Sequence, residues 1–196
     1  MVDIGTGTVV ATIPLGTSYL VGSAVSPDGS RVYVTDGNLN LVKVINTATI
    51  AVAATIGVGW SPHGLAVSPD GARVYVANYM DGTVSVIDTS TNAVVGTIPV
   101  GAGPFAVAFA PNGAKAYVQS INAQTVSVID TGTSSVTATI PVGANPRGIA
   151  VSPDGARVYV PNFNDNTVSV ISTSSETVVA TVTVGVNPAR GSGDAG

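Results

Sequence analysis

A repeat of 42 residues runs through most of this 196-residue chain. The eleven residues AVSPDGARVYV occur at 66–76 and again, unchanged, at 150–160. Self-similarity at a fixed period of this length indicates a repeat architecture, in which each unit is one supersecondary structure that packs on its neighbours. The turn motif that marks the period is SPDG at 26–29, 68–71 and 152–155, and APNG at 110–113.

Each repeat contains four short segments with the alternating, β-branched pattern of strands. In the second repeat they are GLAVS (64–68), RVYVAN (73–78), TVSVID (83–88) and AVVGTIPV (93–100), and we call them strands a, b, c and d. The SPDG turn joins a to b, because its proline presets φ, its aspartate bonds nearby backbone and its glycine adopts a left-handed conformation. The motif is therefore predicted to be scaffold rather than a reactive site.

Proline and small residues predict the order of the strands in each sheet. Strand d carries Pro14, Pro99 and Pro141 at one repeat position, and proline cannot donate to a central ladder, so d is predicted to be the outer edge strand. Small residues allow close convergence, which favours a as the innermost strand of a radial array; they are Ala24, Ala66, Ala108 and Ala150. A four-stranded unit of this length is typical of a β-propeller blade.

The chain is thus predicted to be an all-β, single-domain β-propeller or part of one, with four full blades. The predicted divisions are a leading d strand of a preceding blade in 1–16, blades at 17–58, 59–100, 101–142 and 143–184, and a flexible tail at 185–196.

Four blades leave the closure of the ring open. Val2 and Asp3 match the end of a strand c, and 9–15 match a strand d. An open arc would expose apolar faces at both ends, which soluble monomers avoid. The chain is then a piece of a longer propeller, one half of a homodimer that completes a ring of about eight blades, or a self-closed four-bladed ring; the first two are favoured.

Composition excludes several classes of function. The chain has no cysteine, which excludes thiol catalysis and Cys-based metal sites. A formal charge of −4 with scattered basic residues provides no basic face for nucleic acid. No apolar run approaches the roughly 20 residues of a membrane helix, so no membrane span is expected. A P-loop, a dinucleotide fingerprint and a calcium loop are also missing, and neither cofactor nor metal is expected.

The candidate site lies in the loops that differ between repeats. In a propeller the a–b and c–d turns lie on one face, and the b–c and d–a loops lie on the other, around the central channel. The first set is nearly invariant here, whereas the second diverges, and loops on a rigid scaffold commonly carry function. One equivalent d–a slot holds Val21, His63, Phe105 and Arg147. The candidate ligand-binding residues are Trp60, His63, Tyr79, Asp81, Phe105, Arg147, Phe163 and Asp165.

These residues admit more than one chemistry. His63 is the only histidine; it is a candidate general base or a packed residue at the channel rim. The aromatic candidates could form a rim for a sugar ring or a peptide, or could cap the apolar core. Arg147 is an anion anchor or the partner of Asp165 in an ion pair. Asp81 and Asp165 occupy equivalent slots two blades apart, too distant for a paired acid–base couple.

Four further residues recur just after the SPDG-like turns and are predicted to form a structural row of cations. They are Arg31, Arg73, Lys115 and Arg157.

The segments YVTD (33–36), YVAN (75–78), YVQS (117–120) and YVPN (159–162), with the VSVIDT-like and TIPVG-like strands that follow, carry a family resemblance. They resemble the YVTN family of β-propeller repeats over essentially the whole chain. The resemblance implies surface-layer-like, secreted or periplasmic proteins, and more distantly lactonases and streptogramin lyases. Rings in that family usually close with about seven blades.

We therefore expect a non-catalytic binding or structural scaffold that presents its b–c and d–a loops to a protein, peptide or glycan. The alternative is a propeller hydrolase or lyase with its site at the channel mouth, for which His63 and Arg147 are the candidate catalytic residues. The expected location is extracellular, cell-surface or periplasmic.

Overall fold

The structure, a computed structural model, describes residues 2–3, 5–16, 19–186 and 188, and these contain strands and turns without a helix. The strands are β1 (Val2–Asp3), β2 (Thr8–Val9), β3 (Leu20–Val25), β4 (Arg31–Asp36), β5 (Leu41–Asn46), β6 (Ala51–Gly57), β7 (Pro62–Val67), β8 (Arg73–Asn78), β9 (Thr83–Asp88), β10 (Ala93–Pro99), β11 (Pro104–Phe109), β12 (Lys115–Ser120), β13 (Thr125–Asp130), β14 (Ser135–Pro141), β15 (Ala150–Val151), β16 (Arg157–Asn162), β17 (Thr167–Ser172) and β18 (Thr177–Thr183).

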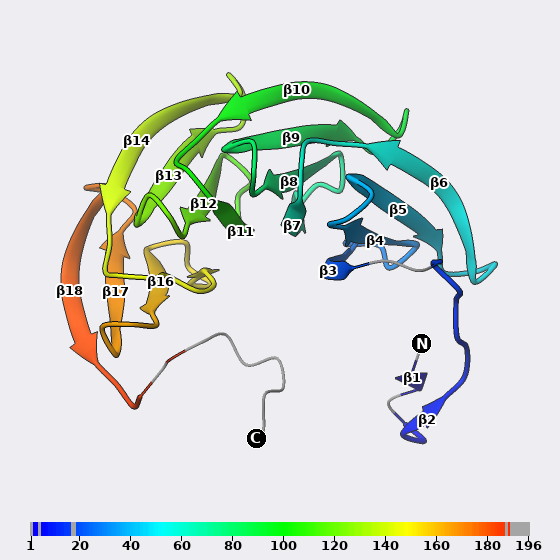
Figure 1. The fold of residues 1–196 in the computed structure, drawn as a ribbon, viewed down its shortest axis with the longest axis horizontal. Helices are drawn as coiled ribbons and strands as arrows, with labels where there is room; N and C mark the ends of the chain where they lie inside the picture. Colours follow the sequence, from blue (N-terminus) through cyan, green and yellow to red (C-terminus); the bar gives the residue numbers. More distant parts are fainter. Residues whose placement is uncertain (1, 4, 17–18, 187, 189–196) are drawn as a thin grey trace.

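Four antiparallel four-stranded sheets follow one another along the chain, β3 to β6, β7 to β10, β11 to β14 and β15 to β18. We number them blades 1 to 4. Figure 1 shows the blades arranged radially, with β3, β7 and β11 toward the centre and β6, β10, β14 and β18 along the outer rim. The predicted propeller architecture and the predicted inner and outer positions of strands a and d are confirmed.

The SPDG turns fold through their own side chains. In blade 2 the Ser68 hydroxyl oxygen accepts the backbone N–H of Arg73 at 2.9 Å, and Asp70 accepts the N–H of Ala72 at 2.9 Å. The backbone N–H of Gly71 donates to the Ser68 carbonyl at 2.8 Å, and Gly71 has φ of +74°. Only glycine adopts that conformation at no steric cost, so the motif closes each a–b hairpin.

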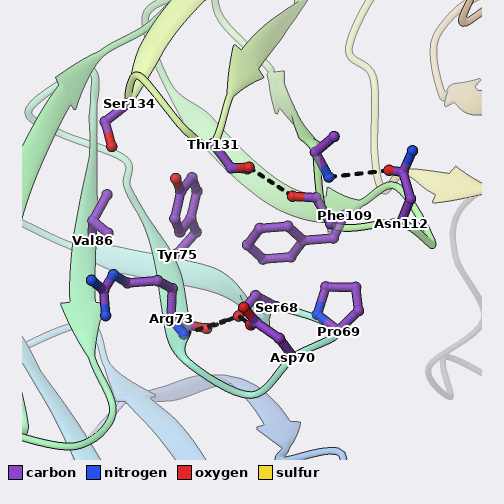
Figure 2. Close-up of a pocket in the computed structure, with 12 residues that line it drawn as sticks. Ser68, Pro69, Asp70, Arg73, Tyr75, Val86, Phe109, Asn112, Thr131 and Ser134 are labelled. Carbon is purple, nitrogen blue, oxygen red and sulfur yellow. Dashed lines mark hydrogen bonds between the residues drawn. The ribbon is translucent and has the colours of Figure 1, made fainter.

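The core is made between blades rather than within one. A tyrosine in strand b points from each blade toward the next, and Tyr33, Tyr75 and Tyr117 are at most 1% exposed. Tyr75 meets Phe109 of blade 3 with ring centroids 4.9 Å apart and planes at 65° (Figure 2). This edge-to-face arrangement is a favourable one for aromatic pairs, and it ties strand b of one blade to strand a of the following blade.

The inner strands approach one another as closely as backbone allows. A Cβ on Gly22 would lie 2.6 Å from the carbonyl oxygen of His63, and one on Gly64 would lie 2.5 Å from that of Phe105. Blade 3 has Ala106 at this repeat position, and the inner strand that follows it, β15, has only two residues.

The leading segment forms less strand than the sequence predicts. β1 pairs with β2 through Val2–Val9 and Asp3–Thr8, in the register of a c–d hairpin. Of the predicted d strand at 9–15, only Val9 lies in a described strand, β2 (Thr8–Val9). Most of the predicted tail at 185–196 lies outside the described residues.

Figure 1 shows an open arc, with β18 at one end and β1–β2 beyond the other. Within the described residues blade 4 makes no sheet contact with blade 1. A ring of four blades closed on itself, one of the three arrangements considered from the sequence, is therefore not what this chain forms.

Candidate functional site

The b–c and d–a loops lie on one face of the arc and are fixed to each other by backbone hydrogen bonds. In blade 2 the N–H of Tyr79 donates to the Ser61 carbonyl at 2.9 Å, and in blade 4 the N–H of Phe163 donates to the Asn145 carbonyl at 3.0 Å. Equivalent bonds join 37 to 19 and 121 to 103. The divergent side chains thus sit on a regular and well-supported frame, as the sequence predicts for a variable loop face.

Four rings from three consecutive blades gather on this face, namely that of His63 and those of three residues around it. We call these four residues the aromatic cluster. The centroid of the His63 ring lies 4.9 Å from Phe105, 5.0 Å from Tyr79 and 6.3 Å from Tyr19. Tyr19 is 54% exposed, whereas the other three are partly buried. The structure therefore brings together three of the predicted candidates and adds Tyr19.

The surroundings of His63 are those of a neutral imidazole. Its Nδ1 atom is buried and has no hydrogen-bond partner. Burial lowers its pKa from the ordinary value of 6.5, because desolvation disfavours the charged form. Its ring contacts are with Tyr19, Tyr79 and Phe105, so burial favours the neutral imidazole and the side chain contributes an aromatic surface.

The three carboxylates on this face support loops. Asp81 accepts the backbone N–H of Trp60 at 2.7 Å, and Asp165 accepts that of Ala144 at 2.7 Å, in the equivalent place two blades on. Asp36 is fully buried and accepts the N–H of Leu39 at 3.1 Å. Each of these side chains fixes backbone close to it in its own blade, and within the described residues none of them forms an ion pair with His63.

Arg147 packs on an aromatic ring. Its guanidinium carbon lies 4.6 Å from the centroid of the Phe163 ring, which is a cation–π contact. The ion pair with Asp165 considered from the sequence is not formed, since the described residues contain ion pairs only between Arg73 and Asp88 and between Lys115 and Glu176. Arg147 therefore presents its charge beside the Phe163 ring.

Two apolar side chains project from the same loops of blade 2. Trp60 is 67% exposed and Met80 is 69% exposed, and the Met80 N–H donates to the Trp60 carbonyl at 3.2 Å. Trp60 is also the only tryptophan of the chain. It is thus a natural reporter for anything that binds this face.

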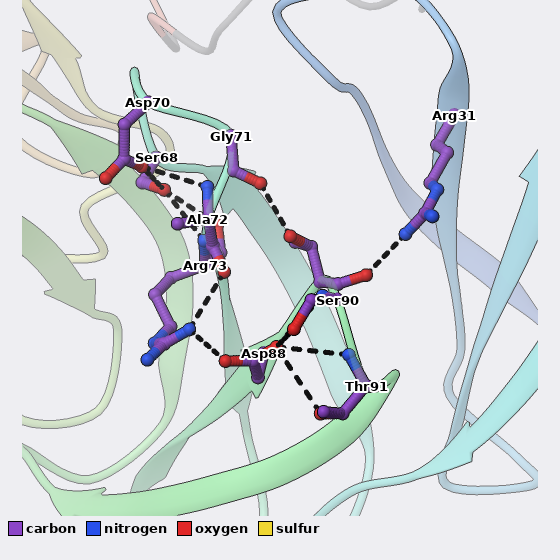
Figure 3. A network of polar contacts seen from close by, with 10 residues as sticks. Arg31, Ser68, Asp70, Gly71, Ala72, Arg73, Asp88, Ser90 and Thr91 are labelled. Carbon is purple, nitrogen blue, oxygen red and sulfur yellow. Dashed lines mark hydrogen bonds and ion pairs between the residues drawn. The ribbon is translucent and has the colours of Figure 1, made fainter.

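The opposite face carries the invariant turns and a repeated polar network. In Figure 3 Arg73 contacts Asp88, which also accepts hydrogen bonds from the c–d turn that follows, while Arg31 of blade 1 reaches the carbonyl of Thr89 in blade 2. Hydrogen bonds from Ser90 and Thr91 hold the pKa of Asp88 well below its usual value. The cations that follow the SPDG-like turns therefore have a structural role where, like Arg31, they join one blade to the next.

Crevices on that face also follow the repeat. One of about 320 Å³ lies between blades 2 and 3, lined in part by Ser68, Asp70 and Tyr75 (Figure 2). A second of about 320 Å³ lies between blades 1 and 2, where Ser26, Asp28 and Tyr33 take the same places. A feature that recurs in the same place at two of the three blade junctions follows the repeat and belongs to the scaffold. A unique ligand site is better sought on the loop face.

The described residues contain no group of three His, Asp or Glu side chains placed to hold a metal ion. They also include no helix that could span a membrane.

Comparison with known proteins identifies the family. Residues 4–123 match the model of the YNCE-like β-propeller family. The chain belongs to that family. Among curated proteins, none matches.

Two solved structures are similar to this chain. A chain of hydrazine synthase from Kuenenia stuttgartiensis is 28% identical, with a TM-score of 0.82 over 91% of this chain and 53% of that one. A functionally unknown protein from Desulfotomaculum acetoxidans DSM 771 is 22% identical, with a TM-score of 0.72 over 85% of this chain and 56% of that one. This chain therefore spans about half the length of either.

Sequence reasoning missed several residues that shape the loop face of this family member. Tyr19 lies in the d–a loop of blade 1. Its aromatic ring is the one signal in that loop by which the sequence could have indicated a site residue. Thr35 donates to the carbonyl of His63 at 2.7 Å, and Gln119 donates to that of Pro146 at 2.7 Å. Both occupy the third position of the YVTD-like segments, where a polar side chain at a buried strand end was a signal for a bond to the next blade.

Proposed function

We propose that this β-propeller is a non-catalytic binding module whose loop face holds an apolar or ring-bearing part of a peptide, protein or glycan. The aromatic cluster is the observation that carries the proposal. Rings of this size offer large contact areas at low cost in conformational entropy, and tyrosine adds a polar edge. Loops that differ between otherwise regular blades supply the specificity.

The arrangement of polar groups favours binding over hydrolysis. A general base needs a proton acceptor within hydrogen-bond reach of its substrate and usually a second group that orients it. His63 has an unpartnered, buried Nδ1, and the aspartates of this face bond to backbone. Arg147 stacks on Phe163. His63 and Arg147, the candidate catalytic residues of a hydrolase, thus do not meet at one point with an acidic partner, as such chemistry requires.

The resemblance to YVTN repeats supports the finer part of the proposal. In surface-layer-like and secreted propellers the repeat is an exposed scaffold, and we extend that role, with an extracellular, cell-surface or periplasmic location, to this chain. The low content of charged side chains, 9%, leaves contact with a ligand on this face largely to apolar and ring surfaces.

The test uses the fluorescence of Trp60. The full chain is titrated with a panel of oligosaccharides (chitohexaose, cellohexaose, mannohexaose) and of peptides (proline-rich and tyrosine-rich), and the emission is followed. We expect a saturable change with at least one probe, weakened more than tenfold by Phe105→Ala or Tyr79→Ala. Arg73→Ala, on the opposite face, is the matched control and should bind as the parent does.

Turnover is measured in the same samples. Lactone and glycoside substrates are incubated with the parent chain and with His63→Ala, whose fold is checked by circular dichroism. Equal, background-level turnover in both fits the proposal. Turnover by the parent that disappears in His63→Ala would show that the chain is a hydrolase rather than a non-catalytic binding module. If no probe gives a saturable fluorescence signal, the loop face is not a binding site for these ligands.

A further inference from the structure

The loop face carries one described cation, Arg147, whose charge has no anionic partner. Its side chain is exposed, and the ion pairs within the described residues join other side chains. The row of cations that follows the SPDG-like turns lies on the opposite face, and Lys43 donates to the Leu15 carbonyl. An arginine that a fold holds in place without a partner of opposite sign is a candidate for contact with an anionic ligand.

The position of Arg147 is fixed at both its backbone and its side chain. Gln119 of blade 3 donates from Nε2 to the Pro146 carbonyl at 2.7 Å, and its Oε1 accepts the Gly148 N–H at 3.3 Å. These two residues lie on either side of Arg147 in the chain. The guanidinium carbon lies 4.6 Å from the Phe163 ring centroid, so the planar fork of donors is already oriented. A group held in this way loses little conformational entropy when a ligand binds.

Gln119 also connects Arg147 to the aromatic cluster. It is fully buried and pairs with Ala106 in the register of β11 and β12, and Ala106 follows Phe105 in the chain. Phe105 and Arg147 occupy the same d–a slot in consecutive blades. The cluster and the guanidinium are therefore successive parts of one rim, joined by a buried side chain.

Side-chain amides accompany both parts of this rim. The Tyr79 hydroxyl donates to Oδ1 of Asn122 at 3.3 Å, beside the aromatic cluster. Nδ2 of Asn145 donates to Oδ1 of Asn164 at 3.1 Å, in the loops that hold the guanidinium. Asn122 and Asn164 are exposed, and each amide retains donors or acceptors beyond the bond that it makes. Groups that both donate and accept are matched to sugar hydroxyls, which do the same.

We propose that the loop face binds an oligosaccharide that carries a carboxylate. A sugar ring packs on the aromatic cluster, hydroxyls bond to the amides, and the carboxylate of a uronic acid pairs with the Arg147 guanidinium. Arginine and carboxylate form two parallel, charge-assisted hydrogen bonds, which add specificity as well as affinity. The inference rests on the proposed function and narrows its ligand from peptides, proteins and glycans to one class.

The backbone of these loops favours a glycan over a peptide. An extended peptide binds largely through main-chain hydrogen bonds to unpaired backbone groups. Here the loops use their backbone groups on each other, as in the bonds from Phe163 to Asn145 and from Arg147 to Pro161. The face offers rings, amides and one guanidinium, which are the groups that a sugar acid needs.

The charge of the chain limits the number of carboxylates on the ligand. The formal net charge is −4, and Asp81 and Asp165 lie on the same face as Arg147. One guanidinium neutralises one carboxylate, whereas each further acid on the ligand would meet like charge. We therefore expect a mostly neutral oligosaccharide with a single uronic acid to bind better than a polyuronate of the same length.

The test is isothermal titration calorimetry of the full chain with a xylotriose that carries one glucuronic acid. Xylotetraose and the methyl ester of the acidic sugar serve as neutral probes of similar size. We expect saturable binding of the acid, weakened about tenfold or more by methyl esterification or by Arg147→Gln, since each removes one charge of the pair. Arg147→Gln should bind the ester as the parent does. Arg157→Gln, a change at an exposed arginine on the opposite face, is the matched control and should bind the acid like the parent.

The outcomes separate this inference from the proposed function. Equal binding of acid and ester by the parent would overturn the inference and leave the binding module in place, with Phe105→Ala weakening both ligands alike. Binding of the peptide acetyl-Tyr-Gly-Glu-Gly-Tyr-amide that depends on Arg147, without binding of the acidic sugar, would assign the site to acidic peptides and overturn the inference. Tetragalacturonate that binds more tightly than the single uronate would contradict the limit set by charge. Binding of none of these probes overturns the inference as well.

Discussion

Replacing Gly64 by alanine tests whether the close approach of the inner strands holds the arc together. The new methyl carbon would lie 2.5 Å from the carbonyl oxygen of Phe105 and 3.0 Å from the Cα atom of Ala106. Both are backbone atoms, so the strands β7 and β11 must separate. Overpacking of this kind costs about 1–3 kcal/mol, and in a chain of this size each kcal/mol lowers the melting temperature by about 2–4 °C.

The assay is urea and thermal unfolding of Gly64→Ala beside the parent, followed by circular dichroism. Gly57→Ala is the matched control, because a Cβ there meets nothing within 4 Å; it should leave stability unchanged or raise it by about 0.4–1 kcal/mol through the unfolded state. An unfolding midpoint for Gly64→Ala at or above that of the parent would refute the reasoning. It would mean that strands β7 and β11 can accommodate a methyl group at this position without separating.

Three further perturbations address the core, the turns and the ion pairs between blades. Tyr117→Ala removes a ring that is 1% exposed and should cost about 3–5 kcal/mol in urea unfolding; a loss below about 1 kcal/mol would contradict the burial. Hydrogen bonds lower the pKa of Asp28 to about 2 and that of Asp70 below its usual value. The folded state therefore holds these protons more weakly than the unfolded state, so stability present above pH 4 should fall between about pH 4 and 2, and urea midpoints that stay flat there would count against it. Lys115→Met should cost no more than about 1 kcal/mol, because its contact with Glu176 is partly exposed; a larger loss in thermal unfolding would show that the contact is worth more.

Turn chemistry and small residues made the blade predictable from the sequence. The SPDG motif specifies a hairpin through the side chains of its own four residues, and Pro99 can stand only where its missing N–H is not needed. Ala66 and its repeat equivalents indicate close convergence of the inner strands for a similar reason. These are local rules that repeat with the period, so the fold, the strand order and the face that carries the variable loops followed from them.

The details of the candidate site depend on contacts between segments that the sequence does not bring together. Asp81 was a candidate for chemistry, yet its oxygen is used by the backbone of Trp60, a partner that only the fold reveals. The same holds for Arg147, whose partner is a ring rather than the expected carboxylate. Tyr159 stands at the repeat position of Tyr117, which is 1% exposed, yet Tyr159 is 40% exposed because no described residue packs over it as the next blade packs over Tyr117.

The most direct test of the claim that the loop face is a binding surface of rings is the titration of His63 by proton NMR. The single histidine gives a single set of imidazole resonances, followed from about pH 4 to 9 in the parent and in Asp81→Asn. A midpoint below 6.5, unchanged in the variant, is the result that burial among rings predicts. A midpoint above that value, falling in the variant, would reveal a carboxylate partner for the imidazole and would contradict the account in favour of a catalytic centre.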